Sequence, residues 1–250
     1  MIARLASRST PSLFALPNRT TIVTGGGRGL GLTVVQALLE SGSSVVALDL
    51  LPKPTQPAWD QSLSLAKSNS LNLTYHTLDV TNASSVTETF QTIFGSTPSD
   101  QPVRGLFCAA GLTILAPIIE HSPEQFKKVI DINLTGTFLC AQAFGREYMA
   151  KNPSNGNGPV KWPFREGYGV KEDTSWKGLG ASVVLTGSMS GSIANVGLES
   201  IGYNASKAGV LSLARNFAME WSRKGIRVNV SCFILELLGS KGVDYADTSG

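Results

Sequence analysis

"TTIVTGGGRGLGLTVVQALLESG", residues 20–42, contains a predicted strand, a glycine-rich turn and a predicted helix in direct succession. A run rich in β-branched residues ends at Thr24, and apolar residues then recur at helical spacing until Gly42, a typical helix stop. Glycines carry no Cβ, so this turn can lie close to a pyrophosphate, which the unpaired N–H groups of the helix N-terminus bind. The stretch predicts a strand, turn and helix that bind a dinucleotide; a merely flexible turn is the alternative. No Lys-Ser/Thr pair follows the glycines, which excludes a P-loop.

A carboxylate at the end of the next predicted strand supports dinucleotide binding. Asp49 lies 18 residues beyond Gly31, close to the spacing expected of a group that accepts from a ribose hydroxyl. A carboxylate there repels a 2′-phosphate and favours NAD, whereas Arg28 inside the turn would bind a phosphate, so NADP stays open. Asp79, after the third predicted strand, is either a helix cap or an acceptor for the adenine amino group.

Short β-rich runs alternate with helical patterns along the chain. The predicted strands are residues 20–24, 44–50, 73–80, 103–110, 181–187 and 226–231. The predicted helices are residues 31–42, 84–95 with a capping box at Ser85 and Glu88, 122–150 with Ser122 as cap, Pro123 first and Gln125 completing the box, and 203–223. This alternation predicts a single Rossmann-like α/β domain, a doubly wound parallel sheet with helices on both faces, spanning residues 20–231.

Three segments lie outside this rhythm. Residues 1–19 are predicted to be a flexible N-terminal extension; the absence of Asp and Glu before Glu40 resembles a mitochondrial transit peptide, the alternative to a cytoplasmic protein. Residues 152–180 hold six Gly and three Pro and are predicted to be a surface insertion. Residues 232–250 are predicted to be an atypical C-terminal tail.

Composition narrows the class of function. The net charge of +3 comes from scattered Lys and Arg, which argues against nucleic acid and an anionic membrane as partners. No run approaches the roughly 18 apolar residues of a membrane helix. The three cysteines, Cys108, Cys140 and Cys232, are predicted to be buried reduced thiols, and two histidines make a metal site improbable.

Several further motifs resemble those of the short-chain dehydrogenases/reductases. The matching pieces, in order, are Thr24-Gly-x-x-x-Gly-x-Gly31, Asp79, Ala109-Ala-Gly111, Asn133, Ser188 and Tyr203-x-x-x-Lys207. The resemblance implies an NAD(P)-dependent oxidoreductase that acts on a small alcohol or ketone. It implies as catalytic residues Asn133, Ser188, Tyr203 and Lys207. It implies as cofactor-binding residues Gly25, Arg28, Gly29, Leu30, Gly31, Asp49, Asp79, Val80, Ala110, Gly111, Asn133, Tyr203 and Lys207.

Proton transfer explains why a phenol and an ammonium lie four residues apart. Hydride transfer at a carbinol carbon requires a proton to leave or join the oxygen, and a Tyr with a pKa of about 10 is a poor base near neutrality. Lys207, one helical turn from Tyr203, is predicted to lower that pKa and to bind cofactor ribose. Ser188 would hold the reacting oxygen, and the resemblance implies that Asn133 orders a water linking Lys207 to solvent. The alternative to a catalytic site is that Tyr203 and Lys207 are an exposed pair on a helix, that Ser188 and Ser190 are ordinary turn residues, and that Asn133 is a hydrogen-bonded residue of the core.

The spacing around the serine gives a hint of substrate. Alignment on Gly191 selects Ser188 over Ser190 and leaves 15 residues to Tyr203, which resembles the branch acting on polyols and ketoses.

The chain departs from the family at Cys108, where Asn is usual, and after Ser231, where Pro-Gly, a covering segment and a further strand are usual. We therefore expect a missing edge strand and weak cofactor binding; a catalytically silent dinucleotide-binding protein or truncated product is the alternative. Family members often form homo-oligomers through their long helices.

Overall fold

The computed structural model describes residues 14–153 and 180–232 of the 250-residue chain. Its centre is a six-stranded sheet in the order β3-β2-β1-β4-β5-β6, in which every neighbouring pair is parallel. The strands are β1 (Thr20–Thr24), β2 (Ser44–Asp49), β3 (Leu73–Thr77), β4 (Val103–Cys108), β5 (Ala181–Gly187) and β6 (Ile226–Cys232). The predicted doubly wound α/β fold is confirmed.

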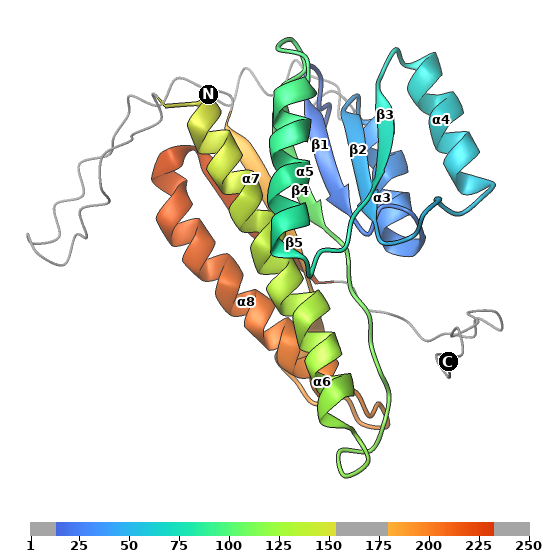
Figure 1. Ribbon diagram of the computed structural model, residues 1–250, viewed down its shortest axis with the longest axis vertical. Helices are drawn as coiled ribbons and strands as arrows, with labels where there is room; N and C mark the ends of the chain where they lie inside the picture. Colours follow the sequence, from blue (N-terminus) through green and yellow to red (C-terminus); the bar gives the residue numbers. More distant parts are fainter. Residues whose placement is uncertain (1–13, 154–179, 233–250) are drawn as a thin grey trace, which may run out of the picture.

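Helices cover the two faces of this sheet (Figure 1). They are α3 (Gly29–Glu40), α4 (Ala58–Ser68), α5 (Ala83–Ser96), α6 (Pro123–Ile130), α7 (Thr137–Lys151) and α8 (Ile201–Trp221), with a π-helical segment η1 (Asp131–Gly136) and short 3-10 helices η3 (Met189–Gly191) and η4 (Ser222–Lys224). α3 packs on β1 and β2, and α4 on α3 and β3, whereas α7 and α8 pack on the β4–β6 half of the sheet and α5 packs on α7. The helix α4 has no counterpart in the sequence-based prediction.

Two helix starts test the predicted caps. Ser122 and Gln125 form the predicted capping box at α6, with Pro123 as the first helical residue. The box predicted at Ser85 and Glu88 is wrong, because Asn82 caps α5 by accepting from the Ser85 N–H at 3.0 Å. Asn is as good a cap as Ser, and here it occurs three residues earlier.

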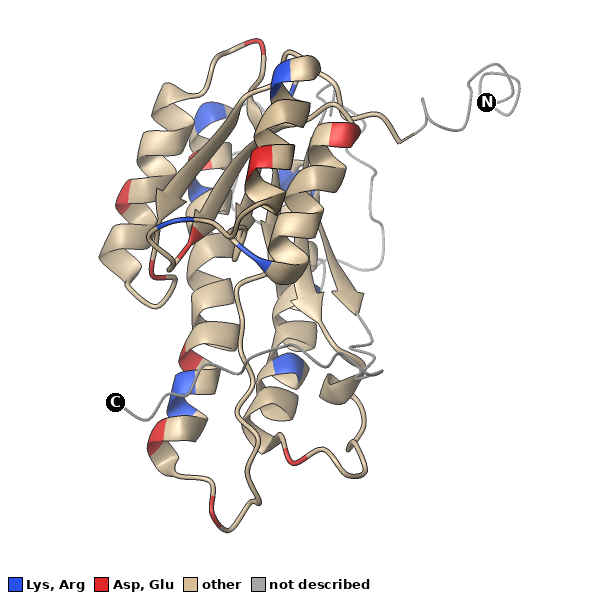
Figure 2. Ribbon diagram, turned by 90° about the vertical axis from the view of Figure 1, so that its right-hand side faces the viewer, with Lys and Arg blue, Asp and Glu red and all other residues tan. Residues whose placement is uncertain are grey.

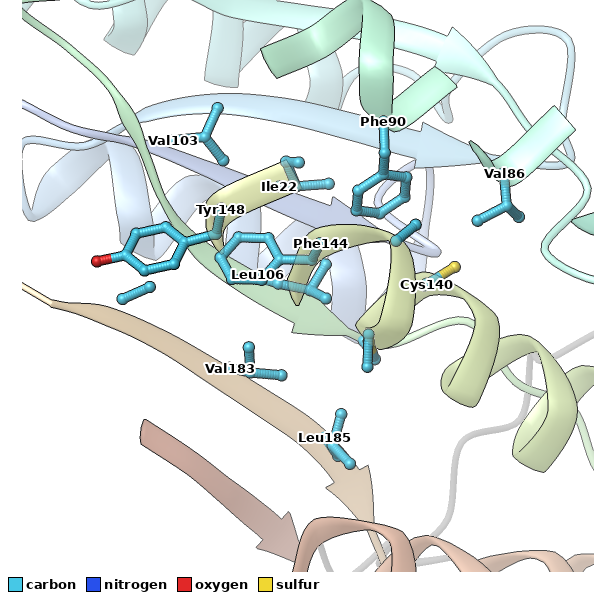
Figure 3. Packing of buried hydrophobic residues seen from close by; sticks show 14 of the residues in the cluster. Ile22, Val86, Phe90, Val103, Leu106, Cys140, Phe144, Tyr148, Val183 and Leu185 are labelled. Atoms are coloured by element: carbon cyan, nitrogen blue, oxygen red, sulfur yellow. The ribbon is translucent and has the colours of Figure 1, made fainter. Parts of the chain in front are cut away.

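Large apolar side chains from both sides of the sheet form the core. On one face Ile22, Leu106 and Val183 of the strands meet Phe144 and Tyr148 of α7 (Figure 3). On the other face Val23, Val45 and Ala47 pack with Val35 and Leu39 of α3 and with Trp59 of α4. Full burial of such a side chain contributes roughly 1.5–3 kcal/mol, so these contacts fix both helix layers on the sheet.

Two thiols lie in this core, and one does not. Cys108 and Cys140 are buried, as predicted, but Cys232 is exposed, which corrects the prediction. The reason is its place at the very end of β6, where the buried part of the strand has already ended.

None of the helices in the described residues is both long and apolar enough to cross a membrane. Lys and Arg are interspersed with Asp and Glu over the helices (Figure 2).

The predicted N-terminal extension, surface insertion and C-terminal tail lie mostly beyond the described residues. These are residues 1–13 of the N-terminal extension, residues 154–179 of the insertion and residues 233–250 of the tail. The last part of the extension is described, and there the Leu16 N–H donates to the Ser41 carbonyl at 2.6 Å.

Candidate active site

The predicted site residues meet at the carboxyl edge of the sheet. In register, Thr24 at the end of β1 lies beside Leu48 on one side and Cys108 on the other. The turns that follow these strands therefore leave the sheet side by side. α6 and the first turns of α8 extend beyond this edge (Figure 1). Ligands of open parallel sheets bind at such an edge.

The glycine-rich turn is packed so tightly that its glycines are required. A Cβ on Gly31 would lie 1.9 Å from the Gly25 carbonyl oxygen, and a Cβ on Gly25 would lie 2.7 Å from the Ala110 nitrogen. Gly25 and Gly29 also have positive φ, +68° and +50°. Arg28, the N-cap of α3, makes no side-chain cap hydrogen bond, so its side chain leaves the first N–H groups of α3 uncovered. A pyrophosphate fits this cradle, because it would bind those N–H groups.

The Asp49 carboxylate lies directly beside the turn. Its Oδ2 accepts from the Gly27 N–H at 2.9 Å and its Oδ1 from the Leu51 N–H at 3.1 Å. A carboxylate offers about four acceptor positions, so two remain for the hydroxyls of a ribose. Arg28 is exposed on the same turn.

The remaining predicted cofactor positions line the neighbouring turns. Asp79 Oδ1 accepts from the N–H and the hydroxyl of Thr81, which is a capping turn just before α5, and the residue is exposed. Val80 is buried against Gly136. The Ala110 N–H donates to the Thr24 hydroxyl at 3.4 Å, which joins the loop after β4 to the end of β1. Leu30 is partly exposed at the start of α3.

A fully buried asparagine connects the loop after β4 to the helix that carries Tyr203. Asn133 Oδ1 accepts from the Leu112 N–H at 2.9 Å, and its Nδ2 donates to the Leu112 carbonyl at 2.8 Å and to the Ser206 hydroxyl at 3.1 Å. The Ser206 hydroxyl donates in turn to the Tyr203 carbonyl at 2.7 Å. Sequence reasoning missed this role of Leu112 and Ser206, for which no local pattern exists.

Ser188, Tyr203 and Lys207 lie together at the end of β5. The Ser188 side chain lies close enough to the Tyr203 phenol to influence its pKa, and the Lys207 Nζ lies 5.4 Å from the Tyr203 ring centroid. The Lys207 ammonium is buried and donates to the Thr186 carbonyl at 2.7 Å. Gly191 allows this approach, since a Cβ there would lie 2.7 Å from the Ala208 backbone nitrogen. Ser190 takes another role, donating its N–H to the Ser188 hydroxyl.

Burial changes the expected electrostatics of this pair. It raises the pKa of the Tyr203 phenol, while the Ser188 side chain acts in the opposite direction and the charge of Cys232 adds to the rise. The sequence-based prediction of a lowered Tyr203 pKa is therefore wrong for the protein alone, because desolvation of the phenol is the largest effect. The same burial lowers the pKa of Lys207 to about 8, against a smaller opposite effect of Cys108.

Comparison with known proteins identifies related chains. Residues 19–158 match a family model described as short chain dehydrogenase, and residues 172–244 match one described as enoyl-(acyl carrier protein) reductase. The Aspergillus versicolor protein named short chain dehydrogenases/reductase notP' is 40% identical over 227 residues, which cover 89% of this chain and 68% of that protein. The ribulose-forming D-arabinitol 2-dehydrogenase of Candida tropicalis is 29% identical, over 86% of this chain and 70% of its own.

A solved structure agrees with the sequence matches. The crystal structure of gox2181 superimposes with a TM-score of 0.68 at 29% identity, and covers 88% of this chain and 73% of its own.

The glycine packing predicts the effect of a single methyl group. We expect Gly31→Ala to lower the stability by about 1–3 kcal/mol and to weaken NADH binding at least about tenfold, because the turn must open to accommodate the Cβ. Gly95→Ala is the matched control, since a Cβ at this α5 position meets nothing within 4 Å. Urea unfolding and NADH fluorescence titration measure the two effects. Equal NADH affinity in both variants would contradict a tightly packed cradle.

The buried ammonium predicts a pH-dependent stability. The pKa of Lys207 is about 8 in the fold against an ordinary 10.5, so the unfolded chain binds more protons between these values. Stability relative to a Lys207→Met variant should therefore rise as the pH rises through that window and level off above it. Urea unfolding of both proteins across this range measures the difference. A difference that stays constant with pH would show that the ammonium is solvated.

Proposed function

Because the chain belongs to the short-chain dehydrogenase/reductase family, we propose that it transfers a hydride between the nicotinamide of NAD(P) and a polyol or its ketose. The chain is an oxidoreductase of that family, and the family uses NAD(P) to interconvert alcohols and ketones. The observation that carries the proposal is the grouping of Ser188, Tyr203 and Lys207 at the same carboxyl edge of the sheet as the glycine-rich turn.

The proposed mechanism assigns each side chain a task at the substrate oxygen. A bound nicotinamide supplies or accepts the hydride. In the reducing direction Tyr203 donates its proton to the carbonyl oxygen, and its raised pKa keeps the phenol protonated near neutrality until that transfer. Ser188 hydrogen-bonds the same oxygen as charge develops there. The nearby ammonium of Lys207 stabilises the phenolate that remains.

The cofactor would be held by the residues that surround the turn. The N–H groups at the start of α3 would bind the pyrophosphate, and Asp49 would accept from the adenosine ribose. The remaining acceptor positions of Asp49 favour NAD, since a 2′-phosphate would meet its negative charge. Arg28 is the residue that would support NADP instead. Lys207 would lie at the nicotinamide end, on its ribose, and Asn133 would hold the loop after β4 against α8 there.

Two observations support a polyol or ketose as the substrate. The 15-residue separation of Ser188 and Tyr203 resembles that of the polyol branch, and the relative from Candida tropicalis is named as an arabinitol dehydrogenase. The competing function is a dinucleotide-binding protein without turnover. NADH binding without oxidation across a panel of ketoses would favour that second function.

We also propose a homo-oligomer in the cytoplasm, with the mitochondrion as the alternative compartment. A groove of ≈ 420 Å³ lined by Leu134 of η1, Phe138 of α7 and Gly209 and Leu213 of α8 would suit a second copy of these helices. Light scattering gives the number of copies, and cell fractionation gives the compartment.

Removal of one oxygen tests the catalytic proposal. We expect Tyr203→Phe to lower kcat for ketose reduction by about 10²–10⁴-fold with NADH affinity nearly unchanged, because the proton donor is lost and the binding surface is kept. Absorbance at the NADH band measures turnover, and fluorescence titration measures binding. Ser188→Ala should likewise lose turnover, whereas Ser190→Ala should keep most of it. Retention of wild-type kcat by the Tyr203→Phe enzyme would rule out the phenol as the acid.

A further inference from the structure

The phenol of Tyr75 belongs to a closed chain of contacts around the Asp49 carboxylate. Its hydroxyl donates to the Leu51 carbonyl at 2.6 Å, and the N–H of the same Leu51 donates to Asp49 Oδ1 at 3.1 Å. Tyr75 therefore holds the backbone residue that holds one oxygen of the carboxylate.

The other end of the chain of contacts closes on the glycine-rich turn. The Gly27 N–H donates to Asp49 Oδ2 at 2.9 Å, and the Gly27 carbonyl accepts from the Thr55 N–H at 2.8 Å. A Cβ on Gly27 would lie 3.0 Å from both Asp49 Oδ2 and the Tyr75 hydroxyl. The turn, the carboxylate and the phenol are thus in mutual contact, and the segment after β2 crosses over all three.

The phenol is itself rigidly placed. Tyr75 is the third residue of β3 and stands opposite Ala47 in the sheet. Its ring packs edge-on against the buried Trp59 of α4, with ring centroids 5.5 Å apart. Burial and the charge of Asp49 raise the pKa of Tyr75 to about 12, so the hydroxyl remains a donor at physiological pH.

From this geometry we propose that Tyr75 is a positioning residue for Asp49 and thereby contributes to the choice of NAD over NADP. The inference rests on the proposed role of Asp49 as the ribose acceptor. Each carboxylate oxygen keeps one backbone N–H and one free acceptor position, and both must face the ribose diol for bidentate recognition. Loss of the Tyr75 hydroxyl frees the Leu51 peptide, so the carboxylate can turn and the diol loses an ordered partner. NADPH, whose 2′-position is a phosphate, does not use this acceptor geometry.

The test compares cofactor affinities of three full-length variants. Tyr75→Phe removes only the hydroxyl. Thr74→Val is the matched control, because it removes a hydroxyl from the adjacent residue of β3, which points to the opposite face of the sheet. Asp49→Asn reports the role of the carboxylate itself. Fluorescence titration with NADH and with NADPH gives both dissociation constants, and near-UV circular dichroism checks that each variant is folded.

We expect Tyr75→Phe to raise the dissociation constant for NADH by about three- to tenfold and that for NADPH by less than about twofold, as for loss of one buried hydrogen bond. Thr74→Val should change neither. A mere loosening of the turn would weaken both cofactors equally, and that result would overturn the inference. The inference would also be overturned if Tyr75→Phe left the preference in affinity for NADH over NADPH unchanged while Asp49→Asn reduced that preference. An unchanged ratio in Asp49→Asn would instead overturn the ribose role of Asp49 in the proposed function, and the inference with it.

Discussion

The buried amide of Asn133 is the constraint on which the arrangement of the site depends. Its side chain exchanges two hydrogen bonds with Leu112 and donates a third to Ser206, and none of it is exposed. A buried polar group left without a partner costs roughly 1–3 kcal/mol, so neither the loop after β4 nor α8 can shift alone without that penalty. Tyr203 and Lys207 owe their position at the sheet edge to this connection. The π-helical segment that carries Asn133 marks the same place, since such segments are frequent at functional sites.

The cofactor half and the catalytic half of the site meet through backbone contacts that only glycines permit. Gly25 lies against the backbone of Ala110. A Cβ on Gly111, one residue further, would lie 3.1 Å from the Asn133 Oδ1 and 4.0 Å from the Lys207 Nζ. The glycine-rich turn, the loop after β4 and α8 therefore form one packed unit.

The sequence predicted the strands well because parallel strands are buried on both faces and read as short apolar runs. β1 and β5 have the predicted bounds, whereas β3 ends at Thr77 rather than at residue 80. There Leu78 and Val80 remain apolar because they pack into the core after the ladder has ended, and pattern alone cannot separate the two cases. The helix α4 was missed because its buried face is carried by Trp59, Ser62 and Ala66, which leave a weak apolar period.

The site was predictable in composition but not in detail. Tyr203, Lys207 and Ser188 form a recognisable spacing, and their grouping follows once the strands are placed in parallel order. The raised pKa of Tyr203 did not follow, because burial is a property of the packed fold and the sequence displays only the neighbouring charge. The partners of Asn133 and the contacts of Tyr75 also join residues that are far apart in the chain.

A crystal structure of the protein with NADH and a ketose analogue would show whether Tyr203 and the glycine-rich turn serve the same bound cofactor. We expect a pyrophosphate at the start of α3 and a substrate oxygen within about 2.6–3.2 Å of both the Tyr203 and the Ser188 hydroxyls, with the nicotinamide facing the carbonyl carbon. A nicotinamide bound away from Tyr203, or a pyrophosphate bound elsewhere than the glycine-rich turn, would contradict this expectation.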